Sequence, residues 1–164
     1  MKRFIMMLVV LGSLASCTVA KPTRTASVKT ALAKFNLAVQ KKDTKTMSSL
    51  FSKSKGVRFF NTIDGVNKAT PSGTATYAEI AQDFNRRKWG LYYTLFIAHS
   101  SVADKEDPYF SFAESIRKGK TVRWKQITPL KFVLPSDGVY GAAYLKWKKE
   151  AGRWVIEEIG YPES

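Results

Sequence analysis

The feature that most limits how this chain can fold is an unbroken run of eight apolar residues near its start, from Phe4 to Leu11. Lys2 and Arg3 precede the run, and mostly small residues follow it from Gly12 to Ser16. A positive start, a short apolar stretch and a small-residue end are typical of a secretory signal. The run is too short for a membrane span, which needs roughly 20 apolar residues. We therefore expect this segment to direct export and to take no part in the fold.

The sequence Leu14-Ala15-Ser16-Cys17 resembles the lipobox of bacterial lipoproteins, in which a branched apolar residue and two small residues precede a cysteine. The resemblance implies that the thiol of Cys17 receives a diacylglyceryl group and that signal peptidase II cuts between Ser16 and Cys17. It also implies that the new amino group is acylated, for example with palmitate. Thr18 in the next position, rather than Asp, resembles an outer-membrane destination if the host has two membranes.

Cys17 is the only cysteine in the chain, so a disulfide within one molecule is excluded. Lipidation accounts for a lone cysteine in an exported protein, because two or more acyl chains bury enough methylene groups for stable membrane attachment. The alternative is an ordinary cysteine of the signal peptide, with cleavage after Ala20. Residues 17–26 are predominantly polar and predict a lipidated tether. The remaining 27–164 are enough for a single domain.

The charge balance concerns partners and not the fold. Lys and Arg number 27 against 13 Asp and Glu, which gives a net charge of +14. Export argues against nucleic acid and leaves lipid head groups, lipopolysaccharide and acidic wall polymers as anionic partners. Basic residues gather in the C-terminal third and predict an anion-binding patch, the alternative being an ordinary solvated face. The predicted patch comprises Arg117, Lys118, Lys120, Arg123, Lys125, Lys146 and Lys148.

Hydrophobic periodicity predicts helices in the first part of the domain and strands in the last part. The expected helices run from a cap at Ser27 to Lys41, behind a cap at Asp43, from a capping box at Thr76–Glu79 to Gly90, and from Asp107–Pro108 to Gly119. The expected strands are 57–60, a buried apolar strand at 91–98, and then 122–124, 130–134, 139–147 and 154–161. Helices followed by antiparallel strands indicate an α+β domain with its helices on one face of a sheet.

This order resembles the NTF2-like, cystatin-like superfamily. The likeness rests on a long helix broken at Lys42-Asp43, a third helix after the first strand, and a closing hairpin from Tyr144 to Ile156. The segment Leu50–Phe59 is also similar to a group of uncharacterised bacterial lipoproteins, whereas 89–126 departs from the usual order. The resemblance implies N-terminal helices packed on a curved, mostly antiparallel sheet that forms a conical pocket. Members of the superfamily include ligand-binding proteins, partner-binding proteins and a minority of enzymes, so the fold does not choose the function.

Three groups of residues are candidates for a reactive site. His99 is the only histidine and lies beside Ser100-Ser101, where a general base is possible in principle but a strand-end histidine is the simpler interpretation. The acids Glu157 and Glu158 include one that should face inward on an alternating strand, where burial would raise its pKa, although ion pairing is the default. The acidic group Asp104, Glu106 and Asp107 lacks the spacing of a calcium loop.

We therefore expect no metal and no cofactor. The predicted function is an envelope-anchored, non-catalytic binding or scaffold domain for an anionic envelope component or a partner protein. The alternative is a small-pocket enzyme of the NTF2-like type that uses an acidic general base.

Overall fold

The computed structural model describes residues 27–63, 68–87, 90–97, 112–113, 116, 124–134 and 142–162. The predicted signal peptide, Cys17, the tether, His99 and the acidic group at 104–107 lie outside the described residues. The helical elements are α1 (Val28–Lys41), α2 (Thr44–Ser48), α3 (Tyr77–Arg86), α4 (Gly90–Tyr92) and η1 (Tyr93–Ile97). The strands are β1 (Val57–Ile63), β2 (Lys68–Ala75), β3 (Lys125–Thr128), β4 (Lys131–Leu134), β5 (Ala143–Glu150) and β6 (Arg153–Pro162).

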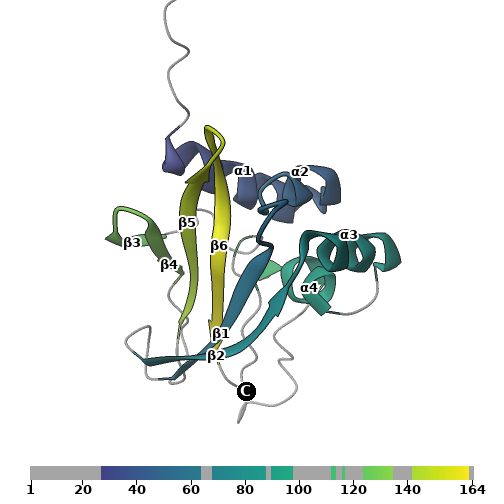
Figure 1. The fold of residues 1–164 in the computed structure, drawn as a ribbon. Helices are drawn as coiled ribbons and strands as arrows, with labels where there is room; N and C mark the ends of the chain where they lie inside the picture. The colour runs from purple at the N-terminus through teal and green to yellow at the C-terminus, as the bar shows by residue number, and fades with distance from the viewer. Residues whose placement is uncertain are drawn as a thin grey trace, which may run out of the picture.

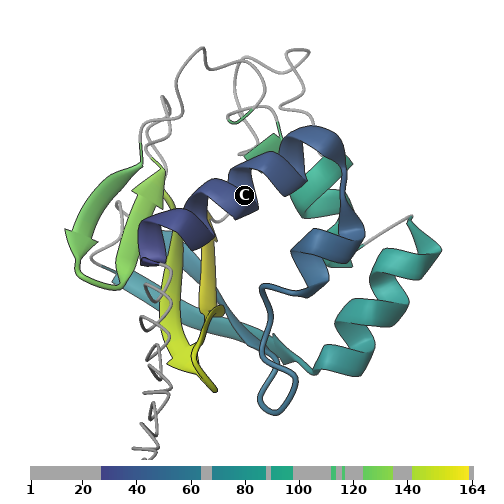
Figure 2. The ribbon, with the colours of Figure 1, turned by 90° about the horizontal axis from the view of Figure 1, so that it is seen from above.

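The strands form one open six-stranded sheet in the order β2-β1-β6-β5-β4-β3. Neighbouring strands are antiparallel except for β1 and β6, which run parallel. The helices gather on one side of the sheet, and α1 and α2 lie in front of it when the molecule is seen from above (Figures 1 and 2). The predicted α+β class with a mostly antiparallel sheet is confirmed.

The first two helices begin at the predicted caps. The side chain of Ser27 accepts a hydrogen bond from the backbone N–H of Thr30 (3.3 Å), and Asp43 accepts one from the N–H of Thr46 (2.9 Å). These contacts satisfy N–H groups that have no partner within the helix. Hydrogen bonds from the hydroxyl and the backbone of Thr46 lower the pKa of Asp43. Lys42, in the left-handed conformation (φ 52°), separates the two helices as predicted.

Helix α3 has the predicted capping box but ends earlier than predicted. Thr76 accepts a hydrogen bond from the N–H of Glu79, and Glu79 accepts one from the N–H of Thr76. The bonds from the backbone and hydroxyl of Thr76 lower the pKa of Glu79. The helix stops at Arg86 because Arg87 adopts the left-handed conformation (φ 54°). The predicted stop at Gly90 was wrong, since Gly90 begins α4.

The predicted buried strand at 91–98 was also wrong. Residues 90–97 are helical, with a single turn in α4 followed by a π-helical turn in η1. The buried side chains Tyr92, Leu95 and Phe96 are spaced three and four residues apart, which is a helical period. A carboxylate oxygen of Asp83 in α3 accepts a hydrogen bond from the N–H of Tyr92 (2.6 Å) and fixes the start of this segment.

Strand β2 was not predicted. Its sequence, Lys-Ala-Thr-Pro-Ser-Gly-Thr-Ala, contains residues that are depleted in strands. Pro71 is tolerated because β2 is an edge strand and because the pairing with β1 shifts at this point: Phe59 lies opposite Gly73, and Phe60 lies opposite Pro71. The edge position therefore explains a strand that local propensity does not indicate.

The described C-terminal part of the chain has four strands, as predicted, but two of them, β3 and β5, are shifted from their predicted positions. Strands β4 and β6 lie where expected, and the turn between β5 and β6 at Ala151-Gly152 is confirmed. Strand β5 runs from Ala143 to Glu150, so it extends past the predicted end at 147, and positions 139–141 lie outside the described residues. The strand predicted at 122–124 is wrong at Trp124, which precedes β3 and packs against the core instead. Its ring makes an edge contact with Phe35 of α1 (6.1 Å between centroids).

The core lies between the helices and the sheet. Phe35 from α1, Phe51 after α2 and Trp147 from β5 are fully buried there. Phe112, Ala113 and Ile116 are helical and buried, which agrees with the apolar spacing predicted for that segment. Because Leu145 and Trp147 point into this core, the side chains that alternate with them on β5 point to the opposite, open face of the sheet.

Candidate functional site

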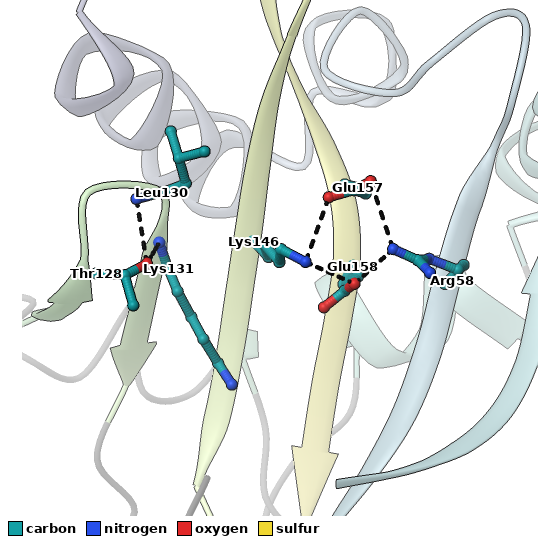
Figure 3. Close-up of polar contacts among 7 residues, drawn as sticks. All are labelled: Arg58, Thr128, Leu130, Lys131, Lys146, Glu157 and Glu158. Atoms are coloured by element: carbon teal, nitrogen blue, oxygen red, sulfur yellow. Dashed lines mark hydrogen bonds and ion pairs between the residues drawn. The ribbon is translucent and has the colours of Figure 1, made fainter. Parts of the chain in front are cut away.

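A shift in strand pairing places two consecutive acids beside the same cations. Lys146 of β5 pairs with Glu158 of β6, whereas Trp147 pairs with Ile156, so Glu157 is an extra residue in β6. Such a β-bulge interrupts the strict alternation of side chains. Both carboxylates therefore lie beside Lys146 and Arg58, as Figure 3 shows. We call Arg58, Lys146, Glu157 and Glu158 the charge cluster.

The charge cluster links three neighbouring strands. Glu158 is the most buried member, with 10% of its side chain exposed, and its Oε1 lies 2.6 Å from Arg58 Nη2 and 3.0 Å from Lys146 Nζ. Glu157 is more exposed, and its oxygens lie 3.4 Å from Arg58 and 3.5 Å from Lys146. Two cations thus face two carboxylates across β1, β6 and β5. The arrangement neutralises a buried acid, which is costly to leave unpaired.

Tyr144 continues the cluster along β5 on the same face. Its ring is almost fully buried, packs against Phe60 (6.3 Å between centroids) and lies under the Nζ of Lys131 (3.9 Å to the centroid). Burial, with the nearby charge of Glu158, raises the pKa of the Tyr144 hydroxyl. Burial also lowers the pKa of Lys131, and the charge of Lys146 acts in the same direction. The tyrosine therefore remains protonated at neutral pH and serves packing.

The positions of Glu157 and Glu158 bear on the prediction that one of these acids is a general base. Neither Glu157 nor Glu158 is the unpaired, inward-facing acid that a general base requires, because both lie within 4 Å of two cations. The expectation that one of them faces inward by alternation was wrong because of the bulge. His99 lies outside the described residues.

Three residues of the predicted anion-binding patch are described. Lys125 is exposed on β3. Lys146 belongs to the charge cluster, and Lys148 lies 3.5 Å from a carboxylate oxygen of Glu150. The members Arg117, Lys118, Lys120 and Arg123 lie outside the described residues. The patch as a whole therefore stays a prediction.

Glu150 also anchors a loop that sequence reasoning missed. Its Oε2 accepts a hydrogen bond from the buried hydroxyl of Ser52 (2.6 Å), and its Oε1 accepts one from Ser54 (3.2 Å). The bond from Ser52 lowers the pKa of Glu150. The N–H of Ile156 donates to the carbonyl of Leu50 (2.7 Å), so the same loop is also tied to β6. Serines at this distance in sequence give no local signal for such a contact.

A shallow groove of about 450 Å³ lies between α1 and the β3–β4 edge. Apolar side chains form much of its wall, and the indole N–H of Trp124 donates to Asn36 within it (2.9 Å). Lys29 is the charged residue of its lining, which comprises Lys29, Leu32, Ala33, Asn36, Trp124, Gln126 and Phe132. The groove combines an apolar surface with amide groups and one cation.

Every carboxylate among the described residues has a defined partner within the fold. Asp43 and Glu79 cap helices, Asp83 holds the start of α4, Glu150 binds the serine loop, and the remaining two belong to the charge cluster. The basic residues are different, because most are exposed and form no ion pair with another described residue. These are Lys29, Lys34, Lys41, Lys42, Lys45, Lys53, Lys55, Lys68, Arg86, Arg87, Lys125, Lys149 and Arg153.

Within the described ranges, no three His, Cys, Asp or Glu side chains come together as metal ligands. The described helices include none with the length and apolar character needed to cross a bilayer. Comparison with protein-family models, with curated proteins and with solved structures finds no match for the chain.

Proposed function

We propose that the chain is an exported bacterial lipoprotein, anchored to a membrane through Cys17, whose basic domain binds an anionic component of the cell envelope or a partner protein without catalysis. In a host with two membranes, the anchor would lie in the outer membrane and the domain would face the periplasm. The signal-like start and the lipobox support export and anchoring. The binding role rests on the charges of the domain.

The observation that carries the binding role is the unequal use of charge. The described acids are all engaged in caps, a loop contact and the charge cluster, whereas most described cations are exposed and unpaired. Most of the described positive charges therefore do not stabilise the fold through ion pairs. Long exposed cations attract anionic partners at short range, and salt weakens that attraction.

We also propose the NTF2-like cone as the finer fold. The break between α1 and α2 at Lys42-Asp43, a third helix after the first strands and the closing β5–β6 hairpin support it. The helices on one side of a curved sheet are the arrangement that the resemblance implies (Figure 1). The pairing of Glu157 and Glu158 with cations supports the non-catalytic proposal over the enzymatic alternative, which would use one of these acids as a general base.

The anchor is tested by the intact mass of the protein extracted from membranes. Loss of residues 1–16 with added acyl mass on Cys17 is the expected result, and Cys17→Ser should give an unacylated protein that leaves the membrane fraction. A freely diffusing, unacylated native protein, or an unprocessed chain in the cytosol, would contradict the anchor.

The binding role needs a separate measurement. The protein should bind vesicles that contain anionic lipid, or isolated wall polymer, more strongly at low salt than at 0.5 M salt, a concentration that reduces the screening length to about 4 Å. Absent or salt-independent binding would contradict the electrostatic proposal.

A further inference from the structure

Helix α1 presents a solvent face of a single charge sign. Its buried stripe includes Phe35 and Val39, and Leu37 lies two residues from each, which is about half a turn away on the opposite side. Leu37 is 47% exposed, the highest value among the large hydrophobic residues in the part of the chain that the structure describes. Lys34 and Lys41 are three and four residues from Leu37 and are therefore its neighbours on that face. An apolar side chain thus lies between two cations.

Further exposed lysines lie close to this face in the sequence. Lys42 and Lys45 are exposed, as is Lys29 in the first turn of α1. The one acid in this region, Asp43, is occupied by the N–H and hydroxyl of Thr46 (2.9 and 2.6 Å) and caps α2. We define the α1 lysine face as Lys29, Lys34, Leu37, Lys41, Lys42 and Lys45.

We infer that the α1 lysine face docks onto the surface of an anionic phospholipid bilayer. The face has no carboxylate, and its cations are lysines, whose flexible stems can follow a fluid layer of phosphates without a fixed geometry. Leu37 can enter the interface between them. A folded protein partner would be expected to meet an aromatic or arginine anchor at the centre of the contact, and the α1 lysine face has neither.

The position of α1 in the chain also favours a lipid bilayer as the surface that this face binds. The helix begins directly after the predicted tether of residues 17–26, and this step rests on the proposed lipid anchor. Ten residues reach at most about 33–36 Å, so the start of α1 cannot lie farther than that from the proposed anchor. The bilayer is then present at a high effective concentration beside the start of α1, so even a weak attraction is enough for docking. Figure 2 looks onto α1 and α2, which lie on the outside of the molecule.

The test uses the full acylated protein in vesicles and an environment-sensitive label on Leu37→Cys. Cys17 is the only native cysteine, so acylation leaves the new thiol as the single labelling site. A label on Ser72→Cys, exposed on edge strand β2, is the matched control. In vesicles with about one-third anionic lipid, we expect an aqueous quencher to reach position 37 several times more slowly than in zwitterionic vesicles, and 0.5 M salt to remove the difference. Position 72 should be quenched equally in both.

Two charge variants distinguish an effect of the α1 lysine face from an effect of the net charge of the protein. Lys34→Gln, Lys41→Gln and Lys45→Gln together should abolish the protection at position 37. The combination Lys55→Gln, Lys68→Gln and Arg86→Gln removes the same charge from the loop before β1, from β2 and from α3, and should preserve the protection. Equal quenching of position 37 in both vesicle types would overturn the inference, as would an equal loss of protection in both variants. Protection by soluble anionic wall polymer but not by anionic vesicles would also overturn it.

Failure of the anchor and failure of the docking are distinguishable. If intact mass shows no acyl chains, the proposed anchor is wrong, and the quenching comparison is then made on labelled chains that carry Cys17→Ser and are added to the same vesicles. Protection at position 37 in anionic vesicles alone would still support the α1 lysine face, and equal quenching would still refute it.

Discussion

Gly160 of β6 lies opposite Tyr144 of β5, and the tyrosine ring occupies the space that a side chain at position 160 would need. A Cβ on Gly160 would overlap three carbon atoms of that ring. The ring in turn lies beneath Lys131 and is almost fully buried. The contact with Gly160 therefore allows the Tyr144 ring to pack against the open face of the sheet, beside the charge cluster.

Gly160→Ala is therefore expected to lower the free energy of unfolding by about 1–3 kcal/mol, because a methyl group in a filled space forces the neighbours apart. Urea unfolding followed by tryptophan fluorescence measures the change. Gly73→Ala on β2 is the control, since a Cβ there meets no atom within 4 Å. It should change stability by less than about 0.5 kcal/mol. Similar losses in the two variants would contradict the contact.

Glu158→Gln is expected to cost more stability than Glu157→Gln. Glu158 is the more buried acid and makes the shorter contacts to Arg58 and Lys146. Removing its charge leaves these cations with one partially exposed carboxylate, at a cost of about 1–3 kcal/mol. The loss for Glu157→Gln should stay below about 1 kcal/mol, as for exposed ion pairs. Urea unfolding at pH 7 compares the two, and an equal or reversed order would be inconsistent with the bulge geometry.

Ser52→Ala should change how stability depends on pH. The Ser52 hydrogen bond lowers the pKa of Glu150 in the folded state below its ordinary value of 4.5. A lowered carboxyl pKa stabilises the fold above the unfolded pKa, and this stabilisation is lost as the pH falls through the folded value. The stability difference between Ser52→Ala and the parent should therefore be larger at pH 7 than at pH 3.

Part of the Ser52→Ala difference should persist at low pH, because the Ser52 hydroxyl also accepts a hydrogen bond from the N–H of Lys55 (2.9 Å). Unfolding curves at several pH values between 3 and 7 provide the measurement. Lys55→Ala, which keeps the backbone N–H, is the control. A difference that is constant with pH would refute the link to Glu150.

Ala151→Gly is expected to stabilise the protein. Ala151 and Gly152 have φ values of 48° and 79°, so both central residues of the β5–β6 turn are left-handed, as in a type I′ turn. A Cβ makes this conformation unfavourable by about 1 kcal/mol. Ala151→Gly should raise the midpoint of thermal unfolding, whereas Ala81→Gly in the middle of α3 should lower it, because glycine weakens a helix interior. A lower midpoint for Ala151→Gly would count against the turn assignment.

The sequence by itself determined the elements whose hydrogen bonds join residues that are close together in the chain. The side chains of Ser27, Asp43 and Thr76 each accept a hydrogen bond from the backbone N–H three residues ahead. Patterns of four residues therefore predict where α1, α2 and α3 begin. Alternation and turn residues likewise indicated β4, β6 and the turn between β5 and β6. The net positive charge also follows from composition alone.

Only the tertiary structure decided the elements that depend on distant partners. Residues 90–97 are helical where a buried strand was expected, and Asp83, nine residues before Tyr92, fixes their start. Strand β2 exists because β1 supplies its hydrogen bonds, despite Pro71 in its sequence. The bulge that places Glu157 and Glu158 beside the same cations is a property of the β5–β6 register. Local patterns carry no information on pairing register, because register depends on which strand lies alongside and how it is shifted.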